Sequence, residues 1–461
     1  MNIKQLITVG AIAMATSQTL TARDSNFTRR GAGPMYWMAY EQCFVTDKPL
    51  SEDRFKMNID WVAQNFKPYG YDMICTDGWI EQGQTINKNG YITKYNSDWA
   101  HDLKYWVEYC NSHGLDAGIY YNPLWLTAAA YNTNARVKGR DDVRTQDIVG
   151  NNSFNSFLYW VDTDKDGAEE WVKGYVNHFK ELGFKFLRVD FVCWYENAYG
   201  TDRYVKMLKW VAEACGEDMM FSLVMPNCFN NSVNEIPYAD LMRVSEDVFG
   251  GGWDFVSGRR RGQYQDGWAN WGNISDGFAA FSEVSGRGKL LMDGDFIRLN
   301  TAETADERQY WVSLNFMTGS AVAISDQYDT GSGLEHFYQN TDLIALNKAG
   351  FAARPLSTNT ASTSSSRWVG QMPDGSWVVG LFNREDEPAT MNIRFKRELG
   401  LEDAEVSDVY DMWAHSSVGP QTGNFTSSVS AHGCRIFKIT TTTKRYQAEV
   451  AGVTGGVVIN Y

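Results

Sequence analysis

From Met35 to about Asp326 the chain alternates short apolar runs with helix-length amphipathic stretches, and this alternation constrains the fold most strongly. Eight runs have the length and composition of strands: residues 35–39, 71–76, 117–121, 184–190, 220–224, 241–244, 289–292 and 321–324. Helical segments lie between them at 51–66, 99–113, 168–182, 202–215 and 301–317. Parallel strands joined by helices with one hand of connection close into a barrel. We therefore predict an α/β protein with a (β/α)8 TIM barrel over residues 28–340.

After about Asn347 the pattern changes to short β-rich runs separated by turns. Strands are predicted at 368–371, 376–383, 390–395, 405–411, 427–431 and 435–440. This spacing is typical of antiparallel sheets, so we expect a C-terminal antiparallel β-sandwich over residues 345–441. Residues 442–461 read as a linker and the start of a further module that the sequence cuts short.

The first 22 residues have the layout of a secretory signal peptide. Lys4 precedes an apolar stretch from Leu6 to Met14, and small residues follow it. The stretch is too short to span a bilayer. We expect cleavage between Ser17 and Ala22 and export to the periplasm or the extracellular space.

Charge and composition narrow the class of partner. The formal net charge is -14, which disfavours nucleic acid and anionic membrane surfaces because these are bound by clustered Lys and Arg. Aromatic residues make up 14% of the chain, and sugar rings stack on such side chains through their apolar faces. A neutral carbohydrate is therefore the expected substrate, whereas the sequence leaves the oligomeric state open.

The sequence predicts neither a metal site nor a cofactor. Residues 162–167 copy the opening of a calcium loop, but Lys173 stands at the twelfth position, where a bidentate Glu is required. We expect this acidic run to cap the following helix instead. The seven cysteines are scattered without paired metal spacing, and several lie in apolar runs, so buried free thiols are expected.

Two aspartates follow predicted strands of the barrel. Asp190 ends the fourth run and Asp247 comes just after the sixth. Because barrel enzymes carry their reactive groups at the carboxyl ends of the strands, both side chains should face one cavity. A single carboxylate there could simply cap the next helix. Two together fit glycosidic bond cleavage, in which one attacks or steadies a sugar cation and the other protonates the leaving oxygen.

Charged neighbours support the pairing of these aspartates. Arg188 lies two residues before Asp190 and on the same strand face, where its cation would keep the carboxylate ionised. Arg243 lies four residues before Asp247 and could orient either that acid or a sugar hydroxyl, or form a structural ion pair. Glu246 is the rival acid, with a loop charge as its alternative role.

The chain resembles a known family in a series of ordered segments: 33–37, Cys75-Thr76-Asp77-Gly78-Trp79, 117–120, 187–190, 374–384, 408–415 and 431–433. These segments are similar to those of melibiase-type α-galactosidases, glycoside hydrolase family 27, and the match runs from Pro34 to Ile439. The resemblance implies a retaining exo-glycosidase that forms a covalent glycosyl-enzyme. Asp190 would be the nucleophile and Asp247 the acid and base.

The same resemblance implies a set of substrate-binding residues around the sugar: Asp77, Tyr120, Arg188, Arg243, Tyr40 and Trp79. Asp77 would accept hydrogen bonds from the 4- and 6-hydroxyls, and Tyr40 would provide an aromatic wall. Tyr40 and Tyr120 could also be ordinary core aromatics. The tail from Tyr446 resembles the start of a carbohydrate-binding module.

Three departures from the family pattern affect the choice of sugar. Thr76 stands where the family usually has a second aspartate, Arg188 replaces a lysine, and residues 224–228 lack the Cys-Glu-Trp pattern that recognises the 2-hydroxyl. We predict hydrolysis of terminal α-D-galactosyl residues. Other glycosidases on this scaffold remain alternatives: α-N-acetylgalactosaminidase, β-L-arabinopyranosidase and isomalto-dextranase. A transglycosylase and a sugar-binding protein without catalysis are further alternatives.

Overall fold

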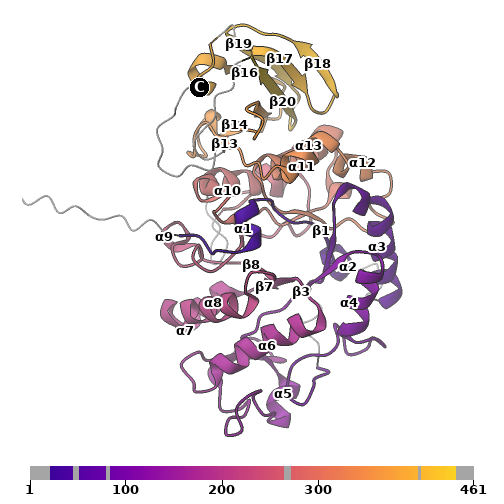
Figure 1. Cartoon of the computed structure of the whole chain (residues 1–461), viewed down its shortest axis with the longest axis vertical. Coiled ribbons are helices and arrows are strands. Elements are labelled where there is room, and N and C mark those ends of the chain that lie inside the picture. The colour runs from indigo at the N-terminus through magenta and orange to yellow at the C-terminus, as the bar shows by residue number, and fades with distance from the viewer. Residues whose placement is uncertain (1–20, 45–50, 79–83, 264–270, 403–405, 443–461) are drawn as a thin grey trace, which may run out of the picture.

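The computed structural model describes residues 21–44, 51–78, 84–263, 271–402 and 406–442. A barrel lies below a smaller β-domain along the long axis of the molecule (Figure 1). Three sequence predictions lie wholly or largely outside the described residues: the signal peptide, Trp79, and the module predicted near the C-terminal end.

Eight parallel strands form the barrel wall, one at each predicted run. They are β1 (Met35–Met38), β2 (Met73–Cys75), β3 (Asp116–Tyr120), β7 (Phe186–Val189), β8 (Met220–Leu223), β9 (Leu241–Arg243), β10 (Leu291–Asp293) and β12 (Val322–Ile324). Their order in the sheet is β10-β9-β8-β7-β3-β2-β1-β12, followed by the short β11 (Phe296–Ile297). The predicted fold class is confirmed.

The sheet closes between β10 and β12. The strand β11 continues the chain directly after β10 and pairs in parallel with β12. In addition, the backbone N–H of Ala321 donates to the carbonyl of Met292, at 3.1 Å. The short link at Gly294 and Asp295 thus turns an open sheet into a barrel, and Asp295 adopts a positive φ of 66° there.

Helices cover the outside of the barrel. They are α1 (Asn26–Arg30), α2 (Tyr40–Phe44), α3 (Glu52–Asn65), α4 (Leu103–Ser112), α6 (Ala168–Leu182), α7 (Val192–Tyr199), α8 (Thr201–Cys215), α9 (Phe229–Ser232), α10 (Ile274–Phe281), α11 (Ala305–Met317), α12 (Glu335–Tyr338) and α13 (Thr341–Lys348). Ser51 caps α3 by accepting the backbone N–H of Arg54, at the start of the predicted segment 51–66. Thr304 caps α11 in a capping box with Glu307, so this helix begins later than the predicted Thr301.

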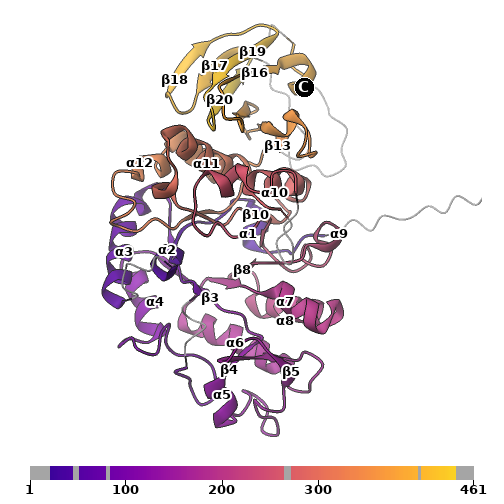
Figure 2. The ribbon, with the colours of Figure 1, turned by 180° about the vertical axis from the view of Figure 1, so that it is seen from behind.

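An insertion between β3 and β7 was not predicted. It contains the antiparallel sheet β4-β6-β5 and the helix α5: β4 (Trp125–Thr127), α5 (Ala128–Thr133), β5 (Val149–Ser153) and β6 (Leu158–Val161). The insertion lies at the end of the molecule opposite the β-domain (Figure 2). Strand β5 is largely exposed and polar, so its sequence carries little strand signal.

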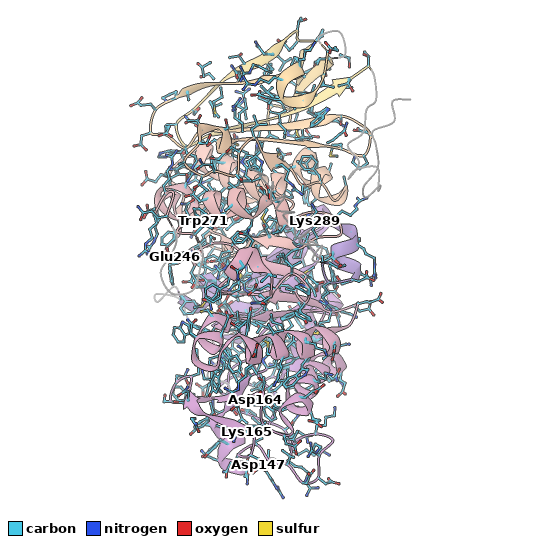
Figure 3. The ribbon with its side chains drawn as sticks, turned by 90° about the vertical axis from the view of Figure 1, so that its left-hand side faces the viewer. Asp147, Asp164, Lys165, Glu246, Trp271 and Lys289 are labelled. Carbon is cyan, nitrogen blue, oxygen red and sulfur yellow. The ribbon has the colours of Figure 1, made fainter. Side chains whose placement is uncertain are left out.

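The carboxyl ends of the barrel strands form one face of the molecule. Glu246, which follows β9, and Lys289, which precedes β10, lie on opposite sides in Figure 3. Apart from Asp116 at the start of β3, the strands are buried along their whole length, as expected for a parallel sheet covered by helices. Residues just beyond the strands on the Glu246 side are therefore the ones that can meet a substrate.

The C-terminal domain consists of two antiparallel sheets, with strand order β13-β14-β15-β20-β17-β18 and β16-β19. The strands are β13 (Arg354–Pro355), β14 (Arg367–Gln371), β15 (Trp377–Phe382), β16 (Ala389–Arg394), β17 (Val406–Asp411), β18 (Ser416–Gly419), β19 (Asn424–Val429) and β20 (Cys434–Thr441). The six predicted strands are present, whereas β13 and β18 were missed. An apolar core that includes Val379, Phe395 and Phe437 lies between the sheets.

The helices α10, α11 and α13 separate the barrel from the sandwich (Figure 1). Polar contacts cross this boundary: the indole N–H of Trp413 donates to the Ser313 hydroxyl at 2.8 Å, and the Asn340 amide donates to the Met412 carbonyl at 3.0 Å. The rings of Tyr310 and Phe382 form a T-shaped pair, with centroids 5.0 Å apart. The two domains are therefore firmly packed on each other.

No disulfide joins any of the seven cysteines, all of which lie in the described residues, and all but Cys43 are buried. Among the described helices, none combines the length and apolarity that crossing a bilayer requires.

Candidate active site

Asp190 lies directly after β7 and is held by three neighbours. The Tyr120 hydroxyl donates to Asp190 Oδ2 at 2.7 Å, and the backbone N–H of Phe191 donates to Oδ1 at 2.6 Å. The side-chain amide of Asn122 donates to the Asp190 carbonyl at 2.8 Å. Phe191 has a φ of 57°, which turns the chain sharply from β7 into α7 and brings its N–H back onto the carboxylate. Both carboxylate oxygens thus accept a hydrogen bond that favours the ionised form.

Asp247 is held differently, by one cation among the described residues. Arg243 ends β9 and places one guanidinium nitrogen against Asp247 Oδ1. Its other terminal nitrogen lies 2.6 Å from Asp295 Oδ2. The predicted contact between Arg243 and the acid is present, and Asp247 shares this arginine with a second carboxylate.

Asp293 and Asp295 form a layer of carboxylates that sequence reasoning missed. Arg188 ion-pairs with both, at 2.6 Å to Asp293 Oδ2 and 3.0 Å to Asp295 Oδ1. Asp295 Oδ2 also accepts the backbone N–H of Val248 at 2.8 Å, one residue after Asp247. The available signal was the Asp-Gly-Asp sequence directly after the seventh predicted strand, at the same barrel edge as the other aspartates.

The expected direct pairing of Arg188 with Asp190 is therefore not what the structure shows. Arg188 acts on Asp190 only through space, and the hydrogen bond from Tyr120 lowers the pKa of Asp190 more strongly than Arg188 does. The direct ion pairs of Arg188 go to Asp293 and Asp295, because these side chains project into the barrel beside it.

Electrostatic effects separate the roles of the two aspartates. Burial raises the pKa of both carboxyls above the usual range. The negative charge of Asp190 raises the pKa of Asp247 further. Opposing effects lower both pKa values: the hydrogen bonds from Tyr120 and Phe191 and the charges of Arg243 and Arg188 act on Asp190, and the charge and hydrogen bond of Arg243 act on Asp247. Asp190 differs in accepting hydrogen bonds from neutral donors at both oxygens, which suits a carboxyl that works in its ionised form.

Glu246, the rival acid, is engaged in a structural ion pair. Its carboxylate lies 2.8 Å from Arg259 Nε, and its side chain is 3% exposed. Its backbone N–H donates to the Trp271 carbonyl at 2.8 Å, and the two residues are neighbours in Figure 3. Its role is thus to hold the loop that follows β9.

Two further predicted substrate-binding residues lie at the barrel mouth. Asp77 follows β2, is 7% exposed and accepts the N–H of Gly78 at 2.6 Å. Burial raises the pKa of its carboxyl to about 8, against the opposing charge of Arg188. Tyr40 begins α2, and its ring stacks on Phe296 with centroids 3.9 Å apart.

The charges of the acidic centre act on the hydroxyl of Tyr40. Burial is the main cause of its raised pKa, and the charges of Asp247, Asp295 and Asp77 raise it further. The structure thus gathers seven of the eight predicted site residues at one end of the barrel. The eighth, Trp79, is outside the described residues.

The acidic run at 162–167 is not a helix cap. The N-cap of α6 is Gly167, which has no side chain. Arg203 contacts both Asp162 and Asp164, and Arg140 pairs with Asp166. Within the described part of the chain, no group of three or more His, Cys, Asp or Glu side chains has an arrangement suited to a metal ion.

Known proteins share both domains of this chain. The model of the α-galactosidase C-terminal β-sandwich domain matches residues 362–439. The isomalto-dextranase of Arthrobacter globiformis is 40% identical over 479 residues, which covers 97% of this chain and 74% of the relative. The structure of the Arthrobacter globiformis T6 isomalto-dextranase complexed with panose has a TM-score of 0.88 at 40% identity and covers 93% of this chain and 76% of that one.

More distant structures share the fold. The GH27 β-L-arabinopyranosidase of Geobacillus stearothermophilus has a TM-score of 0.74 at 18% identity, over 90% of this chain and 99% of that one. The α-galactosidase I of Mortierella vinacea has a TM-score of 0.65 at 16% identity, over 90% and 98%. The barrel and the sandwich are thus a common framework that carries different sugar specificities.

Proposed function

Because the chain belongs to glycoside hydrolase family 27, we propose that it is a retaining glycosidase that cleaves α-1,6-linked glucan chains of the dextran type. Asp190 is the nucleophile, and Asp247 is the acid and base. One observation carries this assignment: Asp190 accepts hydrogen bonds from the Tyr120 hydroxyl and the Phe191 N–H, which stabilise its ionised form, whereas the charge of Asp190 raises the pKa of Asp247 against the opposing charge of Arg243.

In the first step an oxygen of Asp190 attacks the anomeric carbon while Asp247 gives its proton to the leaving oxygen. The bond to the leaving sugar breaks, and an ester forms between the glucosyl unit and Asp190. The hydrogen bonds from Tyr120 and Phe191 hold the attacking carboxylate in one orientation.

The second step depends on the loss of the charge on Asp190, because in the free enzyme that charge raises the pKa of Asp247. Once Asp190 is esterified, it carries no negative charge, so the pKa of Asp247 falls. Asp247, deprotonated in the first step, then takes a proton from water as that water attacks the anomeric carbon. The ester breaks, and Asp190 returns to its ionised form. Two inversions at the same carbon retain its configuration.

The choice of glucan over galactoside rests on the 40% identity with isomalto-dextranase and on two local departures from the galactosidase pattern. Thr76 is buried, and its hydroxyl accepts the backbone N–H of Tyr120 at 3.1 Å, so no second carboxylate stands beside Asp77. In the loop after β8, Cys228 is buried against Met242, with the sulfurs 3.5 Å apart. This position offers no charged partner for a sugar hydroxyl.

Hydrolysis of α-galactosides, the activity predicted from the sequence, is the second candidate. It is supported by the match of residues 362–439 to the α-galactosidase sandwich model. That domain lies outside the barrel mouth, so it bears on the family more than on the sugar.

A substrate panel with covalent trapping tests the proposal. We expect hydrolysis of dextran and of isomalto-oligosaccharides, with little activity on nitrophenyl α-galactoside, α-N-acetylgalactosaminide or β-L-arabinopyranoside. A 5-fluoro-α-glucosyl fluoride should add one glycosyl group to the peptide that contains Asp190, as measured by mass spectrometry, and should not label Asp190→Asn. If the enzyme cleaves the α-galactoside efficiently and leaves dextran intact, the proposed substrate changes from a glucan to an α-galactoside. Labelling of another residue would overturn the nucleophile.

A further inference from the structure

Four of the most exposed aromatic side chains follow the carboxyl ends of barrel strands. Among the described residues, the large aromatic side chains that remain most exposed are Phe44 (53%), Phe157 (49%), Trp194 (45%), Phe229 (50%) and Phe249 (42%). Phe44, Trp194, Phe229 and Phe249 come five or six residues after the carboxyl ends of the barrel strands β1, β7, β8 and β9, whereas Phe157 lies in the turn between β5 and β6 of the insertion. Leaving such rings in water is unfavourable, so the common location of the first four indicates a binding surface.

Of these exposed aromatic residues, Trp194 is linked most directly to the nucleophile. It lies in the first turn of α7, and its ring contacts that of Phe191, with centroids 4.9 Å apart. The backbone N–H of Phe191 is the group that holds Asp190 Oδ1. A ligand that rests on Trp194 is therefore close to the reacting carboxylate without touching it.

A rigid aromatic layer supports Trp194 from below. Phe154 of the insertion packs against both Trp194 and Phe191, with centroids 5.5 and 4.8 Å apart. Behind them Trp125 is fully buried and contacts Phe154 at 5.2 Å. Trp125 also contacts Tyr120, whose hydroxyl binds Asp190. One continuous set of rings thus connects the exposed indole to the nucleophile, and it fixes the indole at low cost in conformational entropy.

We propose that Trp194, supported by Phe154 and Phe191, is a sugar-binding subsite that stacks on a glucosyl residue of the chain outside the one attacked by Asp190. A glucopyranose ring presents an apolar face of C–H groups, which matches an exposed indole. This inference rests on the proposed glucanase function and extends it. It explains why an insertion between β3 and β7 packs an aromatic ring against the turn after the nucleophile strand.

A chain-length experiment tests this subsite. Wild type and Trp194→Ala are compared on dextran, on isomalto-oligosaccharides of increasing length, and on an α-glucosyl fluoride that fills only the reacting position. We expect Trp194→Ala to lower kcat/KM on dextran by about tenfold and to change the rate on the fluoride by less than about twofold. Trp194→Phe should recover part of the loss.

Two controls make the outcome decisive. Val418→Ala, in β18 of the sandwich, removes an apolar side chain of similar exposure, 47%, and should leave both rates unchanged. Calorimetric binding of isomalto-oligosaccharides to inactive Asp190→Asn, with and without Trp194→Ala, measures the subsite without turnover. Equal losses of Trp194→Ala on dextran and on the fluoride would show that the residue only positions Asp190. An unchanged kcat/KM of Trp194→Ala on dextran would rule out the subsite, whereas failure of wild type on dextran would rule out the glucanase function itself.

Discussion

The two halves of the active site are built differently. The nucleophile half is held from inside the barrel: Tyr120 and Phe191 bind the carboxylate of Asp190, and the buried ring of Trp125 lies behind them. The acid/base half is a loop after β9, where Asp247 has one arginine as its direct partner. A nucleophile benefits from one fixed, ionised state, whereas a group that gives and takes a proton needs a pKa that responds to its surroundings.

The loop of the acid/base half is also tied to the second domain. Glu246 pairs with Arg259, whose carbonyl accepts the Asn273 amide at 2.9 Å. From the sandwich, Arg384 donates to Asp276 Oδ1 at 2.6 Å and to Asn273 Oδ1 at 3.3 Å. Its Nε also donates to the Ser257 hydroxyl at 2.5 Å. The sandwich therefore helps to position the segment around Asp247, while the surroundings of Asp190 lie wholly in the barrel domain.

Removing each carboxylate gives the largest expected effects and separates the two halves by stereochemistry. Asp190→Ala should lose about 10⁴-fold or more of kcat on every substrate. Asp247→Ala should lose roughly 10²- to 10⁴-fold on dextran but far less on a glucosyl fluoride, whose leaving group needs no proton. Azide should rescue Asp190→Ala with an inverted β-glycosyl azide and Asp247→Ala with a retained α-glycosyl azide, identified by NMR.

Both variants should fold. Because burial raises the pKa of each aspartate in the folded state, their charged forms cost stability above the unfolded pKa, and the melting temperature should not fall when they are removed. Exchange of the two azide products between the variants would reverse the assigned roles.

Breaking the link between the domains should come next in size. Arg384→Met leaves Asp276, which is fully buried, without its cation and should lower stability by about 3 kcal/mol. If the link positions Asp247, kcat on dextran should fall roughly 10- to 100-fold through misplacement of the loop, with a much smaller loss on glucosyl fluoride. The measurements are thermal unfolding and steady-state kinetics on both substrates below the melting temperature.

A second ion pair between the barrel and the sandwich provides a matched control. Arg261 pairs with Glu385 at 2.7 Å on the exposed rim of this boundary. Arg261→Gln should change stability by at most about 1 kcal/mol and leave kcat unchanged. Equal losses on dextran and fluoride in Arg384→Met would limit the role of Arg384 to folding.

The sequence predicts the barrel well because each strand is buried on both faces and appears as a continuous apolar run. It fails where the signal is polar or depends on neighbours. Strand β5 is largely exposed, and its residues Asn151 to Ser153 resemble a loop. The partners of Arg188 were missed because strand periodicity places a side chain on a face but does not say which of several carboxylates on other strands it will meet. Asp190 and Asp247 were found because each lies at or just beyond a strand end, a position visible without knowledge of the packing.

The smallest expected effect tests how the nucleophile half fixes the ionised state. Tyr120 donates to the charged form of Asp190, so Tyr120→Phe should raise the pKa of Asp190 by about one unit. The acidic limb of kcat/KM against pH, which reports ionisation of the nucleophile in the free enzyme, should then move to higher pH by the same amount, while the alkaline limb stays. Tyr36→Phe is the control: this buried hydroxyl inside the barrel has no hydrogen-bond partner among the described residues, so its loss should shift neither limb. An acidic limb that stays in place in Tyr120→Phe would mean that burial and the arginine charges set the ionisation of Asp190 without the tyrosine. The two halves of the site would then differ only in that Asp247 lies on a loop.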